Sequence, residues 1–194
     1  EFRGGQRERA VSLFRCIRDG RKALVEAPTG SGKSLATLFP ALKAMGEGLI
    51  QQIFYSSTRN TGQLSALQAL DQLHPKGLRV LQVQGRERLC GEDPLCQSGL
   101  CAGQRDFFAR LPEALAEALH REHLTSREVG AIAVRHGCCP HGLQTRLMPW
   151  MDVLVGDVNY VFAPGSRVEL PFHLNHPLLL ADEAHNLPDR ARAM

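Results

Sequence analysis

Apolar residues recur along the chain at two spacings, one typical of amphipathic helices and one typical of buried strands. Spacings of three or four residues predict helices at residues 7–19, 32–45 and 64–73. Short apolar runs predict strands at residues 22–26, 52–57, 78–83, 152–155 and 178–181. Gly20 and Gly46 follow the first two helices, and Pro40 predicts a kink in the second. Strands and helices that alternate in this way favour an α/β fold built on a parallel sheet.

The alternation stops over residues 84–142, where helical patterns replace it. One helix is predicted to start at Pro112, because proline is favoured in the first turn of a helix. Another follows Thr-Ser-Arg-Glu at residues 125–128, which has the spelling of a capping box. We therefore expect an α/β domain made of residues 1–83 and 143–194, into which this stretch is inserted as a small helical domain.

Composition narrows the class of protein. The chain has 194 residues, of which 43% are hydrophobic, and this excludes a wholly disordered or collagen-like chain. No apolar run approaches the roughly 18–20 residues of a membrane span, and the amino end lacks a signal-peptide pattern. The expected location is therefore the cytoplasm, in a bacterium. A formal net charge of +3 permits a nucleic-acid partner without demonstrating one. The first residue is not Met, so we expect the chain to be a piece of a longer protein.

The sequence between the first predicted strand and the second helix has the features of a phosphate-binding loop. Gly30 and Gly32 allow the backbone curvature that turns several N–H groups toward a phosphate, and the helix amino end adds partial positive charge. In such loops the lysine, here Lys33, reaches the β- and γ-phosphates and the serine, here Ser34, ligates Mg²⁺. The candidate nucleotide-binding residues of this loop are Ala27, Pro28, Thr29, Gly30, Ser31, Gly32, Lys33 and Ser34. Alanine occupies the first position, where the general pattern has glycine.

Two adjacent carboxylates follow the last predicted strand, in the sequence Asp182-Glu183-Ala184-His185. Hydrolysis of a nucleoside triphosphate needs such groups: Asp182 would hold Mg²⁺ through its water shell, and Glu183 would orient and deprotonate the attacking water. His185 would link the nucleotide site to the rest of the protein. Since both motifs follow strands of a parallel sheet, we expect them at one edge of that sheet.

With these two motifs in order, the chain resembles the XPD/DinG-like DNA helicases of superfamily 2, which carry an iron–sulfur cluster. The resemblance implies a RecA-like fold and covers nearly the whole chain. It assigns Gln6 to the motif that reads adenine. It assigns the segment from Tyr55 to Arg59 to the first DNA-contacting motif and the segment at residues 157–162 to the Asp-x-Asn-Tyr motif. The DNA-contact candidates are Thr58, Arg59, Asn159 and Tyr160.

Five of the six cysteines fall within 50 residues, which in a domain of this size favours a metal site over disulfides. Chemically, four thiolates held by irregular loops suit zinc or a [4Fe–4S] cluster equally, and His136 and His141 could also serve zinc. The resemblance implies the cluster, with Cys90, Cys96, Cys101 and Cys139 as ligands. Cys139 is preferred to Cys138 because it directly precedes Pro140, and Cys16 is expected in the core.

The function implied by the resemblance is that of an ATP-dependent DNA helicase that needs Mg²⁺. It would translocate on single-stranded DNA with 5′→3′ polarity, unwind duplex junctions and act in DNA repair. The chain would hold the first motor domain and lack the second, so alone it should bind ATP weakly and turn it over poorly. The alternative is a zinc-stabilised nucleic-acid-binding module whose nucleotide site is regulatory.

Overall fold

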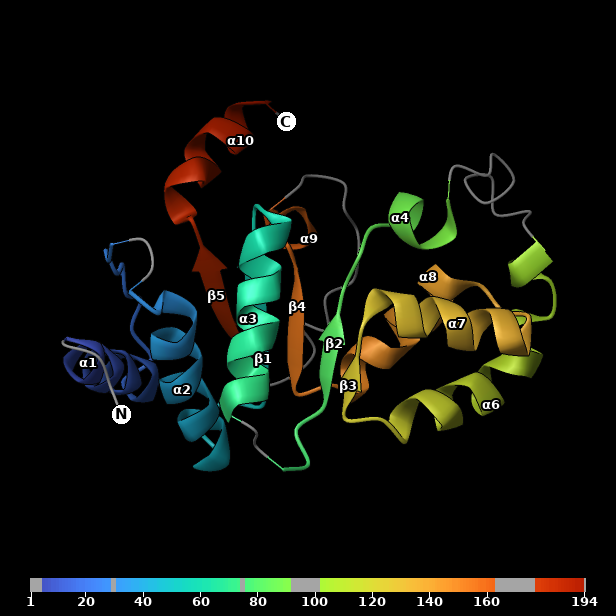
Figure 1. The fold of residues 1–194 in the computed structure, drawn as a ribbon, viewed down its shortest axis with the longest axis horizontal. Coiled ribbons are helices and arrows are strands. Elements are labelled where there is room, and N and C mark those ends of the chain that lie inside the picture. The colour runs from blue at the N-terminus through green and yellow to red at the C-terminus, as the bar shows by residue number, and fades with distance from the viewer. Residues whose placement is uncertain (1–4, 29–30, 74–75, 92–101, 163–176, 194) are drawn as a thin grey trace.

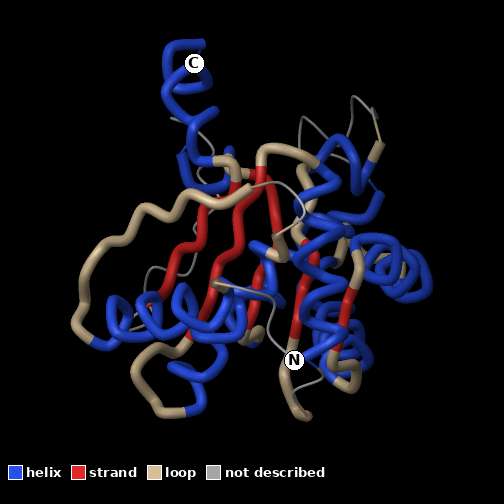
Figure 2. The backbone as a smooth tube through the Cα atoms, turned by 60° about the vertical axis from the view of Figure 1, so that its left-hand side comes forward, coloured by secondary structure: helices blue, strands red, loops and turns tan. Residues whose placement is uncertain are grey.

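A five-stranded sheet forms the centre of the molecule (Figures 1 and 2). The computed structural model describes residues 5–28, 31–73, 76–91, 102–162 and 177–193. The strands pair in the order β3-β2-β4-β1-β5, and every pair is parallel. Their bounds are β1 Gln52–Ser57, β2 Val80–Gln82, β3 His123–Leu124, β4 Val153–Asp157 and β5 Pro177–Asp182. The predicted parallel α/β sheet is confirmed.

One face of the sheet is covered by three helices from the first half of the chain. These helices are α1 (Gln6–Arg18), α2 (Lys33–Gly46) and α3 (Asn60–Leu73). Alternate residues of a strand point to opposite faces, so Ile53 and Tyr55 of β1 lie in the same core as Leu38 of α2 and Leu70 of α3. This packing fixes the amino end of α2 beside the sheet.

The other face is covered by helices of the inserted stretch and the segment after it. They are α6 (Phe107–Leu119), α7 (Ser126–His136) and α8 (Pro140–Leu147), and Figure 1 shows them gathered on the β2–β3 side of the sheet. Phe54, on the side of β1 opposite Tyr55, packs in one cluster with Leu154, Ile132 and Leu143. The inserted stretch therefore shares a core with the sheet.

Short elements complete the described structure. They are α4 (Arg86–Cys90), η1 (Ala102–Gln104), η2 (Met148–Trp150), α9 (Asn159–Phe162), η3 (Ala184–Asn186) and α10 (Leu187–Ala193). In Figure 1, α10 extends away from the body of the molecule beyond the end of β5. No helix in the described part of the chain is long and apolar enough to span a membrane.

The strand predicted at residues 22–26 is wrong. Residues 21–28 are described without any strand pairing, and Leu24 is 92% exposed. A strand needs a partner as well as an apolar sequence. Within the described residues, the edge strand β5 pairs only with β1, and its other edge is open. The segment that leads into the phosphate-binding loop therefore runs through solvent.

Several elements of the inserted stretch also differ from the prediction. α6 begins at Phe107 and keeps Pro112 inside it, because Asp106, with φ of 55°, sets the helix start. β3 is a strand that joins the main sheet, so the stretch is not purely helical. The capping box before α7 is confirmed: the Glu128 amide donates to Thr125 Oγ1 at 3.3 Å, and the Thr125 amide donates to Glu128 Oε2 at 2.8 Å.

Candidate functional site

The amino end of α2 lies directly against Gln6 of α1. Gly32, the residue before α2, has φ of 74°, a conformation that favours glycine. A β-carbon at Gly32 would lie 2.3 Å from Nε2 of Gln6, so the close approach also requires glycine there. The Gln6 side chain is buried and donates from Nε2 to the Ser31 carbonyl at 2.8 Å. Gln6 thus supports the end of the loop, whose Thr29 and Gly30 lie outside the described residues.

The described part of the loop leaves its start open to solvent. Pro28 is exposed and Ala27 is half-buried, whereas Ser31, Gly32, Lys33 and Ser34 are all half-buried at the start of α2. α2 is 14 residues long, so its amino end carries an appreciable partial positive charge. This end can attract an anionic group.

The acidic motif faces this helix end, as the sequence predicts. β1 and β5 run parallel with Ser57 opposite Asp182, which brings the ends of both strands to one sheet edge. Nζ of Lys33 lies 3.8 Å from Oε1 of Glu183. Nε2 of His185 lies 3.4 Å from Oε2 of the same carboxylate, and its side chain is 71% exposed. Segments 150 residues apart in sequence therefore form one site.

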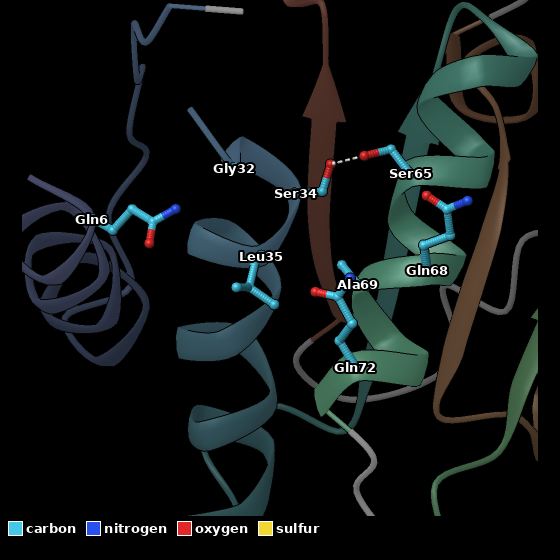
Figure 3. Close-up of a pocket in the computed structure, with 8 residues that line it drawn as sticks. All are labelled: Gln6, Gly32, Ser34, Leu35, Ser65, Gln68, Ala69 and Gln72. Carbon is cyan, nitrogen blue, oxygen red and sulfur yellow. Dashed lines mark hydrogen bonds between the residues drawn. The ribbon is translucent and has the colours of Figure 1, made fainter. Parts of the chain in front are cut away.

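Ser34 lies in a network of hydroxyl groups (Figure 3). Its Oγ is 3.0 Å from Oγ of Ser65 and 3.3 Å from the hydroxyl of Tyr55. Asp182 lies on the strand paired with β1, two positions beyond Leu180, the residue opposite Tyr55. Burial raises the pKa of Tyr55, and the negative charge of Asp182 adds to this. Ser34 and Asp182 supply the hydroxyl and carboxylate oxygens that Mg²⁺ prefers, so this donor set fits a magnesium ion.

A cavity of about 240 Å³ adjoins the network between α1, α2 and α3 (Figure 3). Its lining includes Gln6, Gly32 and Ser34. It also includes residues of α3 that the sequence did not predict as site residues. These α3 residues are Ser65, Gln68, Ala69 and Gln72. A signal for them was present, because residues three and four apart share one face of a helix.

Glu183 has an unusual backbone conformation. Its φ is 55°, and among the described residues only Asp106 shares a positive φ without being a glycine. A side chain in this region costs free energy, and such residues concentrate at functional sites. The conformation turns the chain sharply after β5, between the neighbouring carboxylates of Asp182 and Glu183.

The two cysteines at residues 138 and 139 are both buried but face different surroundings. Cys138 packs in the core cluster with Leu143, and burial raises the pKa of its thiol. Cys139 lines a second cavity, of about 510 Å³, and its Sγ accepts from the Gly142 amide at 3.4 Å. These surroundings favour Cys139 over Cys138 as a ligand.

Other parts of the cysteine-rich stretch come together near Cys139. α4, which ends at Cys90, packs against α8, which begins directly after Cys139. A β-carbon at Gly103 would lie 3.0 Å from the backbone nitrogen of Cys139, so η1 also contacts this point. Cys96 and Cys101 lie outside the described residues. Within the described ranges alone, no group of three or more metal-ligating side chains is present.

The two histidines considered for zinc differ in what they contact. His136 Nε2 lies 2.8 Å from Oε2 of Glu117, so this nitrogen is engaged by a carboxylate. His141 lines the same cavity as Cys139, and burial lowers its pKa. Cys16 is half-buried rather than in the core, and its thiol donates to the Arg21 carbonyl at 3.2 Å.

The candidate DNA-contact residues lie at the ends of the neighbouring strands β1 and β4. Arg59 and Asn159 are exposed, and Thr58 is half-buried. Tyr160 is only 7% exposed and packs in the core, so its ring is not accessible for stacking in this structure. Of the four candidates, the exposed side chains are therefore those of Arg59 and Asn159.

A helix that begins directly after a glycine-rich loop and faces an Asp-Glu-Ala-His motif at the edge of a parallel sheet is the arrangement of DEAD/DEAH-type P-loop proteins. The family model described as DEAD/DEAH box helicase matches residues 8–101. The DEAD_2 model matches residues 56–194, which is more than half of the chain. The chain belongs to the DEAD_2 family and corresponds to the N-terminal part of an XPD/DinG-like superfamily 2 helicase.

Two further comparisons agree with this assignment. The regulator of telomere elongation helicase 1 homolog of Arabidopsis thaliana is 27% identical over 216 residues, which cover 85% of this chain and 20% of that protein. The solved structure named XPD_Helicase superposes with a TM-score of 0.69 at 18% identity, and the match covers 97% of this chain and 34% of that one. The latter similarity establishes the fold, and the chain spans about a fifth of the length of the plant relative.

Proposed function

We propose that this protein is an ATP-dependent DNA helicase that moves along single-stranded DNA and unwinds duplex junctions. Membership of the DEAD_2 family supports a DNA helicase that uses ATP. The observation that carries the proposal for this chain is the 3.8 Å separation of Lys33 Nζ and Glu183 Oε1, which places the loop and the acidic motif in one site. We also propose 5′→3′ polarity, a role in DNA repair and a cytoplasmic location in a bacterium.

Each residue of the site has a proposed role that its position supports. Lys33 and the amino end of α2 would hold the phosphates, with Gln6 reading the adenine edge beside the loop. Ser34 and Asp182 would hold Mg²⁺, and the positive charge of the bound ion would stabilise the negative charge on the phosphates. Glu183 would accept a proton from the attacking water, and its contact with His185 would connect the site to the rest of the protein.

The inserted stretch is proposed to hold a [4Fe–4S] cluster on Cys90, Cys96, Cys101 and Cys139. Thiolates are the ligands such clusters require. The packing of α4 and η1 around Cys139 supports this set, as does the separate burial of Cys138 in the core. The division of the chain into a motor domain (1–83 and 143–194) and a cluster domain (84–142) stays part of the proposal.

DNA would run along the sheet edge formed by the ends of β1 and β4, where Arg59 and Asn159 are exposed. An arginine can bind phosphate with two parallel hydrogen bonds, and an asparagine can bind phosphate or a base edge. Thr58 would contact the DNA beside Arg59, whereas Tyr160 would contribute by packing in the core. We also propose that these 194 residues alone turn over ATP poorly, because they lack the second motor domain.

The decisive experiment compares Lys33→Ala with Lys43→Ala, two lysines of the same helix, in the full-length helicase that contains these residues. Lys43 is 53% exposed and pairs with Glu47, so it serves as a matched control. Lys33→Ala should lower DNA-dependent ATP turnover and unwinding by at least about 100-fold, because a preorganised positive charge on the phosphates is lost. Lys43→Ala should keep both activities. Equal activity of the two variants would refute the catalytic assignment.

Polarity is tested with partial duplexes that carry a single-stranded tail at one end. The proposal expects unwinding of a duplex with a 5′ tail and little unwinding of one with a 3′ tail. ATP turnover stimulated by DNA without unwinding of either substrate would point to a translocase instead.

A further inference from the structure

Arg88 of α4 belongs neither to the nucleotide site nor to the proposed cluster ligands. Its Nη1 donates to Oδ1 of Asn60 at 2.8 Å and to Oε1 of Gln84 at 3.2 Å. Asn60 is the first residue of α3, and Gln84 lies between β2 and α4. Arg88 therefore connects α4 to the start of α3.

The sheet topology places Arg88 at the same edge as the exposed DNA-contact candidates. β2, β4 and β1 are neighbours in the sheet and run parallel, so the segments that follow them lie at one edge. Figure 1 shows α4 and α9 at this end of the sheet. Asn159 begins α9, and Arg59 directly precedes Asn60, the partner of Arg88. An exposed positive charge thus lies beside the proposed DNA path.

The Gln84 acceptor of Arg88 is held in place by buried residues. The Gln84 amide donates to Oε1 of Gln144 at 2.9 Å, and its carbonyl accepts from Nε2 of Gln144 at 3.0 Å. Nε2 of the Gln84 side chain donates to Oε1 of Gln63 at 3.2 Å. Gln144 and Gln63 are 1% and 2% exposed. This network fixes the oxygen that Nη1 of Arg88 contacts, which limits the orientations of the guanidinium.

The two hydrogen bonds orient Arg88 without neutralising it. Both acceptors are amide oxygens, which carry no net charge, so the positive charge of the guanidinium stays available. Both bonds also use Nη1, whereas a guanidinium has five N–H donors. Within the described part of the chain, Nε and Nη2 of Arg88 have no hydrogen-bond partner. These two nitrogens can donate two parallel hydrogen bonds to a phosphate.

We infer that Arg88 binds a phosphate of single-stranded DNA, and that Asn60 and Gln84 position its guanidinium for this contact. This inference rests on the proposed function, because it assumes DNA at this edge of the sheet. A purely structural link between α3 and α4 would use Nη1 but would not need an exposed positive charge. The two roles therefore differ in how DNA binding should depend on salt.

The test is Arg88→Gln in the full-length helicase that contains these residues. The measurement is the fluorescence anisotropy of a labelled single-stranded oligothymidylate, titrated at several KCl concentrations. We expect the dissociation constant to rise about tenfold, as for loss of a hydrogen bond to a charged group. The slope of log affinity against log salt should become shallower by about 0.7, the contribution of one phosphate contact on a single strand. Binding of an ATP analogue and the melting temperature should stay close to the wild-type values.

Three further variants separate charge from packing. Arg79→Gln changes another exposed arginine, which directly precedes β2 and so lies at the opposite edge of the sheet, and it should leave affinity and slope unchanged. Arg88→Lys keeps the charge but loses the paired donors, so it should keep the slope and lose part of the affinity. Asn60→Asp is isosteric and sets a carboxylate against Nη1. It should weaken binding and make the slope shallower, as Arg88→Gln does.

The outcomes distinguish this inference from the proposed function. An Arg88→Gln protein with wild-type affinity and slope would overturn the inference while the helicase proposal stands. Weaker binding with an unchanged slope would show a structural link only, and an equal change in Arg79→Gln would show a general effect of charge. Either result would overturn the phosphate contact. A wild-type protein that does not bind the oligothymidylate would contradict the proposed function itself.

Discussion

Gly62 and Asp182 are in such close contact that a β-carbon on Gly62 would lie 2.9 Å from Oδ2 of the aspartate. The same β-carbon would lie 2.1 Å from Oγ of Ser57, at the end of β1. The first turn of α3 therefore packs directly on the carboxylate that we assign to magnesium. Glycine is needed here for space, because Gly62 does not have a positive φ.

Gly62→Ala should lower ATP turnover by about tenfold or more, because the added methyl group must displace Asp182 or Ser57. The measurement is steady-state turnover as a function of Mg²⁺ concentration. Gly130→Ala in α7 is the control, since a β-carbon there meets no atom within 4 Å. It should keep activity and gain stability of up to about 1 kcal/mol. Wild-type turnover in Gly62→Ala would show that the contact does not constrain Asp182.

Replacing Glu183 by glycine should raise the stability of the protein and lower its activity. Glu183 has φ of 55°, which glycine adopts without strain, so Glu183→Gly should raise the free energy of unfolding by about 1 kcal/mol. Turnover should fall by at least about 100-fold, because no side chain remains to accept a proton. Denaturant unfolding and ATPase assays measure the two effects.

Asp106→Gly provides the matched control, because Asp106 also has φ of 55° and lies before α6, away from the site. This variant should gain similar stability and keep its activity. If Glu183→Gly kept wild-type turnover, Glu183 would not be the group that activates water.

The neighbouring cysteines at residues 138 and 139 should differ in their effect on bound iron. Cys139→Ser should lower the iron and sulfide content of anaerobically purified protein, because it removes a proposed ligand. Cys138→Ser should keep iron near about four atoms per chain and lose only stability, since this thiol packs in the core. Elemental analysis and visible absorbance measure the metal. Zinc in place of iron, or iron loss confined to Cys138→Ser, would contradict the assignment.

Gln144 should be important for stability, because it holds the chain at residue 84. Its side chain is 1% exposed, accepts from the Gln84 amide at 2.9 Å and donates to the Gln84 carbonyl at 3.0 Å. Gln144→Met keeps the size of the side chain but leaves both backbone groups without these partners. Unfolding in urea should show a loss of about 2–3 kcal/mol. Gln51→Met, at an exposed position, should lose almost nothing.

Stability in acid should depend on Glu117. A hydrogen bond from Arg135, followed by one from His136, lowers the pKa of this carboxyl below its ordinary value of 4.5. A lowered pKa in the folded state stabilises the protein above pH 4.5, and this contribution is lost as the pH falls through the folded value. Glu117→Gln should therefore be less stable than wild type near neutral pH, and the two urea midpoints should converge below pH 4.5. A constant difference across this range would contradict the assigned cause.

Local signals predicted some elements closely, and long-range contacts explain the failures. β1 has the predicted bounds because its six residues are all buried, and the capping box marks the start of α7. The segment at residues 22–26 has a strand-like sequence but no partner in the described part of the chain. The sequence predicted that Lys33 and Glu183 would meet, and they do. The predicted reason holds only for Glu183, which follows β5, because the loop before Lys33 follows no strand within the described residues and the packing of α2 on the sheet brings Lys33 to this edge.

Tyr55 and Gly62 were not predicted as residues of the nucleotide site, for a physical reason. Tyr55 belongs to the site only because β1 and β5 pair in a register that aligns it with Leu180. Gly62 belongs to it only because α3 crosses above Asp182. Neither the register nor the crossing can be read from a single segment, since both depend on residues more than 100 positions away.

The side of β5 that has no strand partner within the described residues has a consequence for handling the protein. An unpaired strand edge offers N–H and C=O groups to any extended chain, and such edges promote aggregation. Leu179 of β5 is 41% exposed, so the hazard includes apolar surface. Preparations of these 194 residues should therefore aggregate as the protein concentration rises. A peptide that pairs with β5 as an additional strand should reduce this aggregation.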